Sequence, residues 1–202
     1  MTEAGAPSSR SRHPAYGLLH ADAVQLLRGL SAQGPQQELL RQEMLHHLAA
    51  RPDAMARTGP PAHFTASCFV LDPSLERVLL THHRRAQKWW QLGGHLEADD
   101  RRVRAGAARE AQEESGMSGL KLSQRAVHLD RHRLVGSFGR CEEHLDIRYA
   151  ALAPDGALPR VSEESLEVRW WPVDALLEGT RDELVGPVEL ARRALSAPAG
   201  TG

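Results

Sequence analysis

The sequence contains few cysteines, no long apolar span and almost no net charge. The two cysteines, Cys68 and Cys141, are too few for a disulfide framework in a chain of 202 residues. It shows no recognisable signal peptide and no apolar run of membrane-spanning length. These absences argue against a disulfide-rich secreted scaffold and an integral membrane protein. We therefore expect a cytoplasmic location and no membrane partner.

Positive and negative charges nearly cancel, with 25 Lys and Arg against 26 Asp and Glu and a formal net charge of −1. This balance gives no general attraction for nucleic acid or for an anionic membrane. We expect no stable nucleic-acid binding, so any phosphate must be bound by a local site. A chain of this length with 41% hydrophobic residues can bury one sizeable core, which favours one domain with an extension.

The most informative segment covers residues 93–117 and reads GGHLEADDRRVRAGAAREAQEESGM. A Gly-Gly turn and an acidic loop come first, and an alanine-rich stretch that favours a helix follows. We expect Asp99 or Asp100 to cap this helix at its N-terminus. Gly116 stands where the chain must leave the helix in a left-handed conformation.

Three glutamates of this helix, Glu110, Glu113 and Glu114, fall within one ~100° sector at about 100° per residue. A solvated face is the common interpretation of such a cluster. It fits poorly here, because Glu110 and Glu114 are like charges at i and i+4 and Arg109 can neutralise only one carboxylate. A hard cation with oxygen ligands, Mg²⁺ or Mn²⁺, would remove the repulsion. The segment therefore predicts a site for a divalent metal and phosphate.

The same segment resembles the signature of the Nudix hydrolase family, in which a glycine and an acidic residue precede Arg-Glu-apolar-any-Glu-Glu-any-Gly-apolar. The matching positions are Gly94, Arg109, Glu110, Ala111, Glu113, Glu114, Gly116 and Met117. There are two departures: Asp100 replaces the usual glutamate, and eight residues rather than seven separate it from Arg109. We place the extra residue near residues 99–102, because an insertion inside the helix would rotate the glutamates by ~100°.

The resemblance implies a fold, a metal and the residues that bind it. The fold is an α/β/α sandwich with a mixed β-sheet. The residues implied to hold Mg²⁺, or Mn²⁺ in its place, are Gly94 through its carbonyl, Glu110, Glu113 and Glu114. Glu97, in the loop beside Gly94, is the next candidate, either as a metal ligand or as a residue that supports the ligands. Arg109 would orient this site by an ion pair with Glu110 or Glu97.

The general base is the least defined part of the expected site, because relatives draw it from different places. Glu163 and Glu164 resemble a region from which some relatives supply another glutamate to the metal, and of the two we favour Glu164. A solvated acidic turn is the alternative interpretation of this pair.

The rest of the chain is expected to form three parts: a disordered N-terminus over residues 1–15, a helical extension over 16–57 and the Nudix domain over 58–197. Amphipathic helices are predicted at 21–30 and 35–50, followed by a linker at 52–61. The apolar stripes of these helices either pack on their own domain or form a homodimer interface.

Strands are predicted at 64–71, 77–83, 144–152 and 167–171, with a short helix beginning at residue 172 and a last helix at 188–195. Mixed strands with helices before, within and after them favour an α/β sandwich, preceded here by the helical extension. No internal repeat is apparent.

Some histidines and tryptophans admit two interpretations. Two alternating sets are each expected to share a strand face: His128, Asp130 and His132, and His144, Asp146 and Arg148. A hydrogen-bonded or solvated face is the first interpretation of these sets, and a second metal site or an acid/base group is the other. His95, directly after the glycines, is placed near the expected phosphate. A tryptophan is more often core than a platform on which a nucleobase stacks.

The leading functional hypothesis is a Mg²⁺-dependent Nudix pyrophosphohydrolase that cleaves the diphosphate linkage of a nucleoside diphosphate derivative or a nucleoside triphosphate. The alternative is a non-catalytic Nudix-type module that senses or binds a nucleotide metabolite. A third activity on this fold, isomerisation of an isoprenoid diphosphate, normally needs a catalytic cysteine. No motif around Cys68 or Cys141 suggests one.

Overall fold

The structure is a computed structural model that describes residues 14–84, 87–134, 141–163, 165–176, 178 and 180–197. Most of the N-terminal segment predicted to be disordered lies outside the described residues, and so does Glu164. Among the described residues, no helix combines the length and the apolar character that crossing a membrane requires.

The chain forms four α-helices and eight strands in the described parts. In order, they are η1 (Pro14–Tyr16), α1 (Gly17–Gly29), α2 (Pro35–Ala50), β1 (Ala62–Leu71), β2 (Arg77–His83), β3 (Lys88–Trp90), β4 (Leu92–His95), α3 (Val103–Ser115), β5 (Lys121–Leu122), β6 (His128–Arg133), β7 (Glu143–Leu152), β8 (Ser165–Pro172) and α4 (Arg181–Ser196). The longer predicted elements are confirmed in type, and their ends shift by a few residues.

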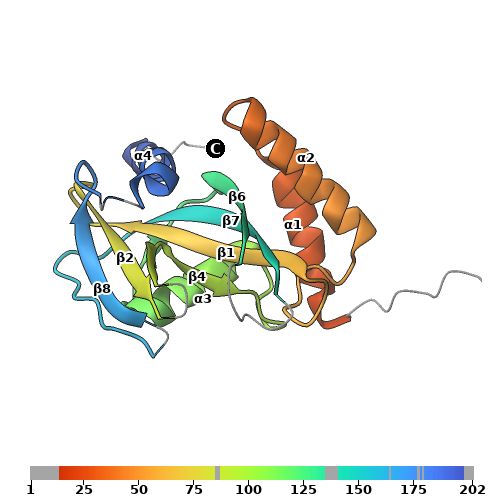
Figure 1. The fold of residues 1–202 in the computed structure, drawn as a ribbon, viewed down its shortest axis with the longest axis horizontal. Helices are drawn as coiled ribbons and strands as arrows, with labels where there is room; N and C mark the ends of the chain where they lie inside the picture. The colour runs from red at the N-terminus through yellow and green to blue at the C-terminus, as the bar shows by residue number, and fades with distance from the viewer. Residues whose placement is uncertain are drawn as a thin grey trace, which may run out of the picture.

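The strands form one mixed sheet with β1 and β7 at its centre. These two strands run parallel, whereas the other strand pairs are antiparallel. Strand β1 changes its partner on the other edge, pairing with β4 over residues 65–68 and with β2 at residues 70 and 71. This change of partner lets the sheet open beside β4. Figure 1 shows α3 on one face of the sheet and α4 on the other.

Alternation along β1 explains the two layers, because successive side chains point to opposite faces. Phe64, Ala66, Cys68 and Val70 enter the core that includes α1, α2 and α3. On the other face, Phe69 and Leu71 pack in the core shared with α4, while Thr65 and Ser67 bond to a buried carboxylate. One strand thus carries an apolar layer on one face and a half-polar layer on the other.

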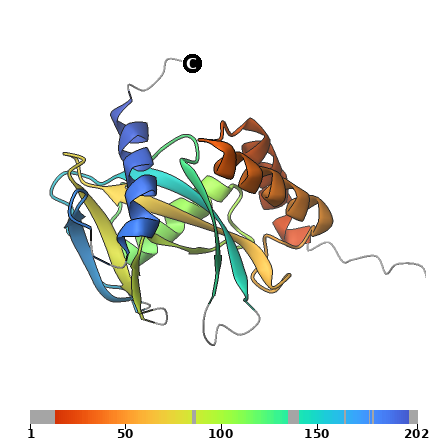
Figure 2. The ribbon, with the colours of Figure 1, turned by 45° about the horizontal axis from the view of Figure 1, so that its top comes forward.

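The N-terminal helices pack on the same core as the sheet. Leu19, Leu27, Met44 and Leu48 are fully buried in one cluster with residues of β1 and α3. Figure 2 shows both helices lying against one end of the sheet. The first interpretation of their apolar stripes, packing on their own domain, is therefore confirmed, while a homodimer through these helices stays a prediction.

The segment between α2 and β1 is not the loose linker that its prolines indicated. Ala54, Met55 and Ala56 are fully buried, and Phe64 N–H donates to the carbonyl of Ala54. The linker prediction was wrong because proline and glycine mark turns, and a turn can still be packed into a core.

Helix α3 begins later than expected. Its first residue is Val103, and neither Asp99 nor Asp100 caps it. The backbone N–H of Val103 donates instead to Asp22 Oδ2 at 2.8 Å, so a carboxylate of α1 satisfies the N-terminus of α3. At the other end Gly116 has φ of 65°, the left-handed conformation that was predicted.

Near the C-terminus two expectations change. The short helix expected from residue 172 is wrong: β8 continues to Pro172 and a turn follows it. The last helix starts earlier than predicted, at Arg181, and continues through Pro187. A proline in the second turn of a helix removes one hydrogen bond. The burial of Leu184, Val188 and Ala191 against the sheet offsets this loss.

Candidate functional site

The two glycines of β4 bring the strand into close contact with its neighbours. A Cβ atom on Gly93 would lie 2.3 Å from the Cβ of Ser67 in β1. A Cβ atom on Gly94 would lie 2.7 Å from Glu110 Oε2 in α3. A side chain at Gly93 would collide with the backbone of β1, whereas one at Gly94 would displace the carboxylate of Glu110, so the Gly-Gly pair permits close packing on both sides of the strand.

The three glutamates of α3 have different environments. Glu114 is 5% exposed, and its Oε2 accepts a hydrogen bond from the backbone N–H of Gly93 at 2.8 Å. Glu110 lies one turn earlier beside Gly94, with 15% of its side chain exposed. Glu113 is 59% exposed and faces outward. Two of the three predicted carboxylates therefore face the Gly-Gly strand, and the third lies at the rim.

Arg109 joins the acidic loop to the helix. Its Nη2 bonds to Asp100 Oδ2 at 2.8 Å, and its Nη1 lies 3.0 Å from a carboxylate oxygen of both Glu110 and Glu113. Burial disfavours the charged guanidinium, but the hydrogen bond to Asp100 and the charge of Glu110 outweigh it and raise the pKa of Arg109. Arg109 thus connects the acidic loop to two glutamates of α3.

The partners of Arg109 differ in part from those that the resemblance implied. The ion pair with Glu110 is present, whereas Glu97 reaches only 3.9 Å and is 64% exposed. The closest contact is with Asp100, which is 8% exposed and also accepts the N–H of Glu97 at 2.9 Å. Asp100 is therefore the buried partner of Arg109. The sequence alone did not predict this ion pair.

The acidic groups around Arg109 outnumber its single positive charge, which fits the oxygen-donor set that Mg²⁺ or Mn²⁺ prefers. The three carboxylates point to different partners. Arg109 bonds to Glu110 and Glu113, whereas Glu114 accepts a bond from Gly93. The residues that could hold such a cation are Glu110 and Glu114 on the buried side, Glu113 and Glu97 at the rim and the carbonyl of Gly94.

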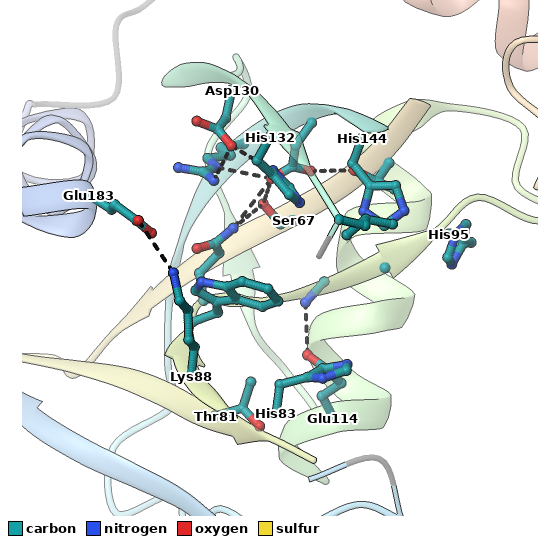
Figure 3. A pocket seen from close by; sticks show the side chains of 18 of the residues that line it. Ser67, Thr81, His83, Lys88, His95, Glu114, Asp130, His132, His144 and Glu183 are labelled. Carbon is teal, nitrogen blue, oxygen red and sulfur yellow. Dashed lines mark hydrogen bonds and ion pairs between the residues drawn. The ribbon is translucent and has the colours of Figure 1, made fainter. Parts of the chain in front are cut away.

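A cavity of about 760 Å³ opens above the Gly-Gly strand, in the range of small-molecule sites. Gly93, Gly94 and Glu114 form part of its wall, so the acidic helix contributes directly to it. Figure 3 shows Glu114 on the side opposite Asp130 and His132. Basic residues also line it: Arg57, Arg84, Lys88, Arg131, Arg133 and Arg148. Carboxylates line it as well, and Lys88 and Arg148 are paired with acidic residues of the wall, so the cavity presents charges of both signs.

The cavity floor is a hydrogen-bonded network centred on Asp146 of β7. Thr65 and Ser67 donate to its carboxylate at 3.0 and 2.6 Å, and Arg148 Nε donates at 2.9 Å. Arg148 also pairs with Asp130 of β6 at 2.7 Å. Because Asp130 and Asp146 are register partners, Arg148 separates two carboxylates that would otherwise repel each other.

The alternating sets on β6 and β7 thus share one face, as predicted, and form mainly a hydrogen-bonded network. Asp130 Oδ2 accepts a bond from His132 Nδ1 at 2.7 Å, and although burial opposes ionisation, the contacts with His132 and Arg148 lower the pKa of Asp130. His144 does not join this network. It lies instead with His63, His95 and Cys141, a grouping that sequence spacing does not reveal.

The expected base region is only partly described. Glu163 lines the cavity, and its backbone carbonyl accepts a bond from Arg84 at 3.3 Å. Glu164, the favoured residue, lies outside the described residues. Trp90 also lines the cavity, half-buried, with its ring 5.8 Å from His83 and 5.9 Å from His132.

Comparison with solved structures shows relatives of the same architecture. The MutT protein from Methanosarcina mazei Go1 is similar over 68% of this chain and 98% of its own, with a TM-score of 0.51 and 17% identity. A NUDIX-family hydrolase from Clostridium perfringens is 23% identical over 66% of this chain and 95% of its own, with a TM-score of 0.46. At these identities the likeness concerns the fold alone.

The family itself is shown by sequence. No curated protein was found to match the chain. A family model described as the NUDIX domain, however, matches residues 61–188, which is more than half of the chain and includes the Gly-Gly strand, Arg109 and the three glutamates. The predicted fold class, a mixed sheet between helices with helices α1 and α2 before it, is also observed. The chain belongs to the NUDIX domain family.

Proposed function

We propose that the chain is a cytoplasmic pyrophosphohydrolase that depends on Mg²⁺, or on Mn²⁺ in its place. Its substrate would be a nucleoside diphosphate derivative or a nucleoside triphosphate, cleaved at a diphosphate linkage. The observation that carries this proposal is the position of Glu114, which lines the cavity and bonds to Gly93, with Glu110 close behind it beside Gly94. Two poorly exposed acids beside a substrate-sized cavity suit metal-assisted hydrolysis.

The roles follow from the contacts of each residue. Glu110, Glu113 and Glu114, with the carbonyl of Gly94 and with Glu97, would hold the cation. When bound, such a cation supplies positive charge to the phosphoryl oxygens and acidifies water. Arg109 is a positioning residue, because its bonds to Asp100 and Glu110 fix the loop and the helix relative to each other.

Cleavage of a diphosphate spreads negative charge over the phosphoryl oxygens in the transition state, so fixed positive charge stabilises it. Arg84, Lys88 and Arg131 line the cavity and can contact the phosphates of a bound substrate. Trp90 offers a ring face on which a nucleobase can stack. We propose Glu164 as the general base that activates water, on the resemblance of Glu163 and Glu164 to the region from which some relatives supply a further glutamate.

The test is a substrate screen with purified full-length chain in Mg²⁺ and in Mn²⁺. The panel contains nucleoside triphosphates, nucleotide sugars, dinucleotides and coenzyme A, and mass spectrometry of the products locates the broken bond. Release of products cleaved at a diphosphate supports the proposal. Tight nucleotide binding with no cleavage under any metal would contradict it and support the non-catalytic binding module.

A further inference from the structure

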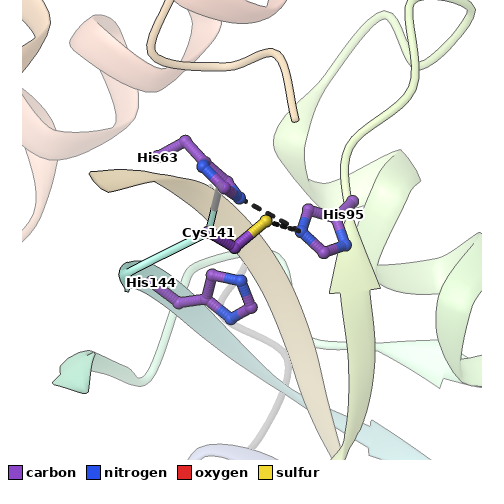
Figure 4. Close-up of side chains that lie close together, drawn as sticks. All are labelled: His63, His95, Cys141 and His144. Atoms are coloured by element: carbon purple, nitrogen blue, oxygen red, sulfur yellow. Dashed lines mark hydrogen bonds between the residues drawn. The ribbon is translucent and has the colours of Figure 1, made fainter. Parts of the chain in front are cut away.

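A second group of metal-ligating side chains lies beside the acidic helix. His63 stands at the start of β1, His144 is its register partner at the start of β7, and His95 ends β4. Cys141 precedes β7 and completes the group. Figure 4 shows the four side chains directed toward one another, three from these strands and Cys141 from the segment just before β7. The parallel pairing of β1 with β7 is what brings residues so distant in sequence together.

The spacing of the four side chains suits a tetrahedral metal ion. His63 Nε2 lies 3.1 Å from His95 Nε2, and Cys141 Sγ lies 3.9 Å from His95 Nε2. The four potential ligand atoms all lie within 4.8 Å of one another. Around tetrahedral Zn²⁺, two nitrogens are about 3.3 Å apart and a nitrogen and a sulfur about 3.6 Å apart, given the usual bond lengths. The group is therefore close to the size of one coordination sphere.

The hydrogen bonds around the group leave ring nitrogens directed inward. His63 Nδ1 faces the carbonyl of Pro60 at 3.0 Å, so it donates there and its Nε2 carries a lone pair toward His95. A hydrogen bond between ring and carbonyl is also what commonly orients a metal-bound imidazole. His144 Nε2 is buried and has no hydrogen-bond partner among the residues described. A cation would give His144 Nε2 the partner that it lacks and would replace the contact between the His63 and His95 rings.

An imidazole binds a metal in its neutral form, and in this group the His63 ring is buried while the His95 and His144 rings are partly buried. Three imidazoles and one sulfur are a borderline-soft donor set that suits Zn²⁺ and is unsuited to Mg²⁺, which prefers oxygen. The donor chemistry therefore separates this group from the carboxylates of α3.

We propose that His63, His95, Cys141 and His144 bind one Zn²⁺ ion. Binding forms three Zn–N bonds and one Zn–S bond, and the proton of the Cys141 thiol leaves to solvent as the thiolate forms. Four protein ligands fill a tetrahedral site, so its role is structural and not catalytic. The ion ties the starts of β1 and β7 to the end of β4.

The site lies next to the acidic helix through the backbone of His95. This residue follows Gly94 directly, and its carbonyl accepts a bond from Arg109 Nη2 at 2.9 Å. Zinc at this position would hold β4 in place and so keep the Gly-Gly strand against α3. The inference does not depend on the proposed hydrolysis, because it concerns binding and stability.

The test uses the full-length chain, stripped of metal by a chelator and then titrated calorimetrically with Zn²⁺ in a large excess of Mg²⁺. We expect one Zn²⁺ per chain, a raised melting temperature and release of one proton per ion. Cobalt replaces zinc as a spectroscopic probe: the intense d–d bands of tetrahedral Co²⁺ and a sulfur-to-cobalt charge-transfer band are expected.

Variants assign the ligands. Cys141→Ser should abolish the charge-transfer band, and His144→Ala should weaken Zn²⁺ binding more than about 100-fold, beyond what loss of an outer hydrogen-bond partner costs. The matched controls are Cys68→Ala, which removes the other thiol, and His46→Ala on an exposed face of α2, and both should bind as wild type. Circular dichroism of each variant checks that it folds.

Three results would overturn the inference: equal Zn²⁺ affinity in wild type and in the Cys141→Ser/His144→Ala double variant, complete displacement of Zn²⁺ by the excess Mg²⁺, or weak octahedral cobalt bands without the charge-transfer band. Where a variant fails to fold, X-ray absorption of the zinc-loaded wild type decides the matter. A first shell of nitrogen and sulfur supports the site, and an all-oxygen shell contradicts it.

Discussion

The molecule holds two clusters of metal-ligating residues that were assembled in opposite ways. The carboxylates of α3 come from one continuous segment, with Glu110, Glu113 and Glu114 within two turns of a helix. The second cluster joins His63 to His144 across the parallel β1–β7 pair. The first offers oxygen to hard cations, and the second offers nitrogen and sulfur to zinc. They meet at β4, where Gly94 and His95 are neighbours.

This comparison shows why proximity in space need not mean shared chemistry. Gly94 lies against Glu110 of the helix, while the ring of His95 turns toward His63. Because successive residues of a strand face opposite sides, one strand can serve both clusters at once.

The largest effect is expected at the acidic cluster. Glu113→Gln and Glu114→Gln each remove one negative charge without changing shape, so turnover of the substrate found in the screen should fall by about 10²–10³-fold. The control is Glu76→Gln, an exposed residue of the β1–β2 turn, whose turnover should match wild type. Steady-state rates with saturating Mg²⁺ measure the effect. Turnover within a few-fold of wild type in both variants would show that these carboxylates are not required for hydrolysis.

The next effect concerns the partner of Arg109. Asp100→Asn breaks a buried ion pair and should lower the free energy of unfolding by about 3 kcal/mol. Glu97→Gln is the matched control, because Glu97 is exposed and 3.9 Å away, and should change stability by less than about 0.5 kcal/mol. Urea unfolding of both variants gives the comparison, and equal effects would refute the assignment of Asp100.

A smaller effect depends on pH. Burial, helped by the charge of Arg148 and opposed by Asp130 and Asp146, lowers the pKa of His128 to about 4. Below an ordinary histidine pKa of about 6.5 the unfolded chain binds this proton and the folded chain does not, so stability falls from pH 6.5 to 4, by roughly 2–3 kcal/mol. His128→Gln should make this slope shallower, with the remainder due to the other partly buried histidines, His95 and His144, as measured by urea unfolding at several pH values. A slope equal to that of wild type would exclude His128 as its source.

The smallest effect concerns the cap of α3. Asp22→Ala removes the acceptor for Val103 N–H and should cost about 1 kcal/mol. Asp99→Ala is the control, since Asp99 was expected from sequence to be a cap and is exposed in the structure. Thermal unfolding of both variants distinguishes them, and a larger loss for Asp99→Ala would favour the original prediction.

Features that depend on local spacing were predictable from sequence. The helix that carries the glutamates and the left-handed Gly116 follow from helix propensity and from glycine's freedom at positive φ, and both are observed, although Glu113 faces outward. The strand faces of β6 and β7 followed from alternation in the same way. These properties depend on residues only a few positions apart, so the periodic pattern of the sequence is enough to predict them.

Features that depend on distant contacts were not predictable. The cap from Asp22 comes from a helix about eighty positions away, and the meeting of His63 with His144 depends on the register of β1 against β7. The burial of Met55 in an apparent linker likewise depends on how α1 and α2 pack. Tertiary contacts of this kind leave no local period in the sequence.

The metal dependence of hydrolysis tests the central claim most directly. The full-length chain is stripped with a chelator, given back one equivalent of Zn²⁺, and assayed on the diphosphate panel before and after Mg²⁺ is added. The account predicts no cleavage with Zn²⁺ alone and full cleavage once Mg²⁺ or Mn²⁺ is present, with loss of that activity in Glu114→Gln. Cleavage that needs only the single equivalent of Zn²⁺, or none with any metal, would contradict it.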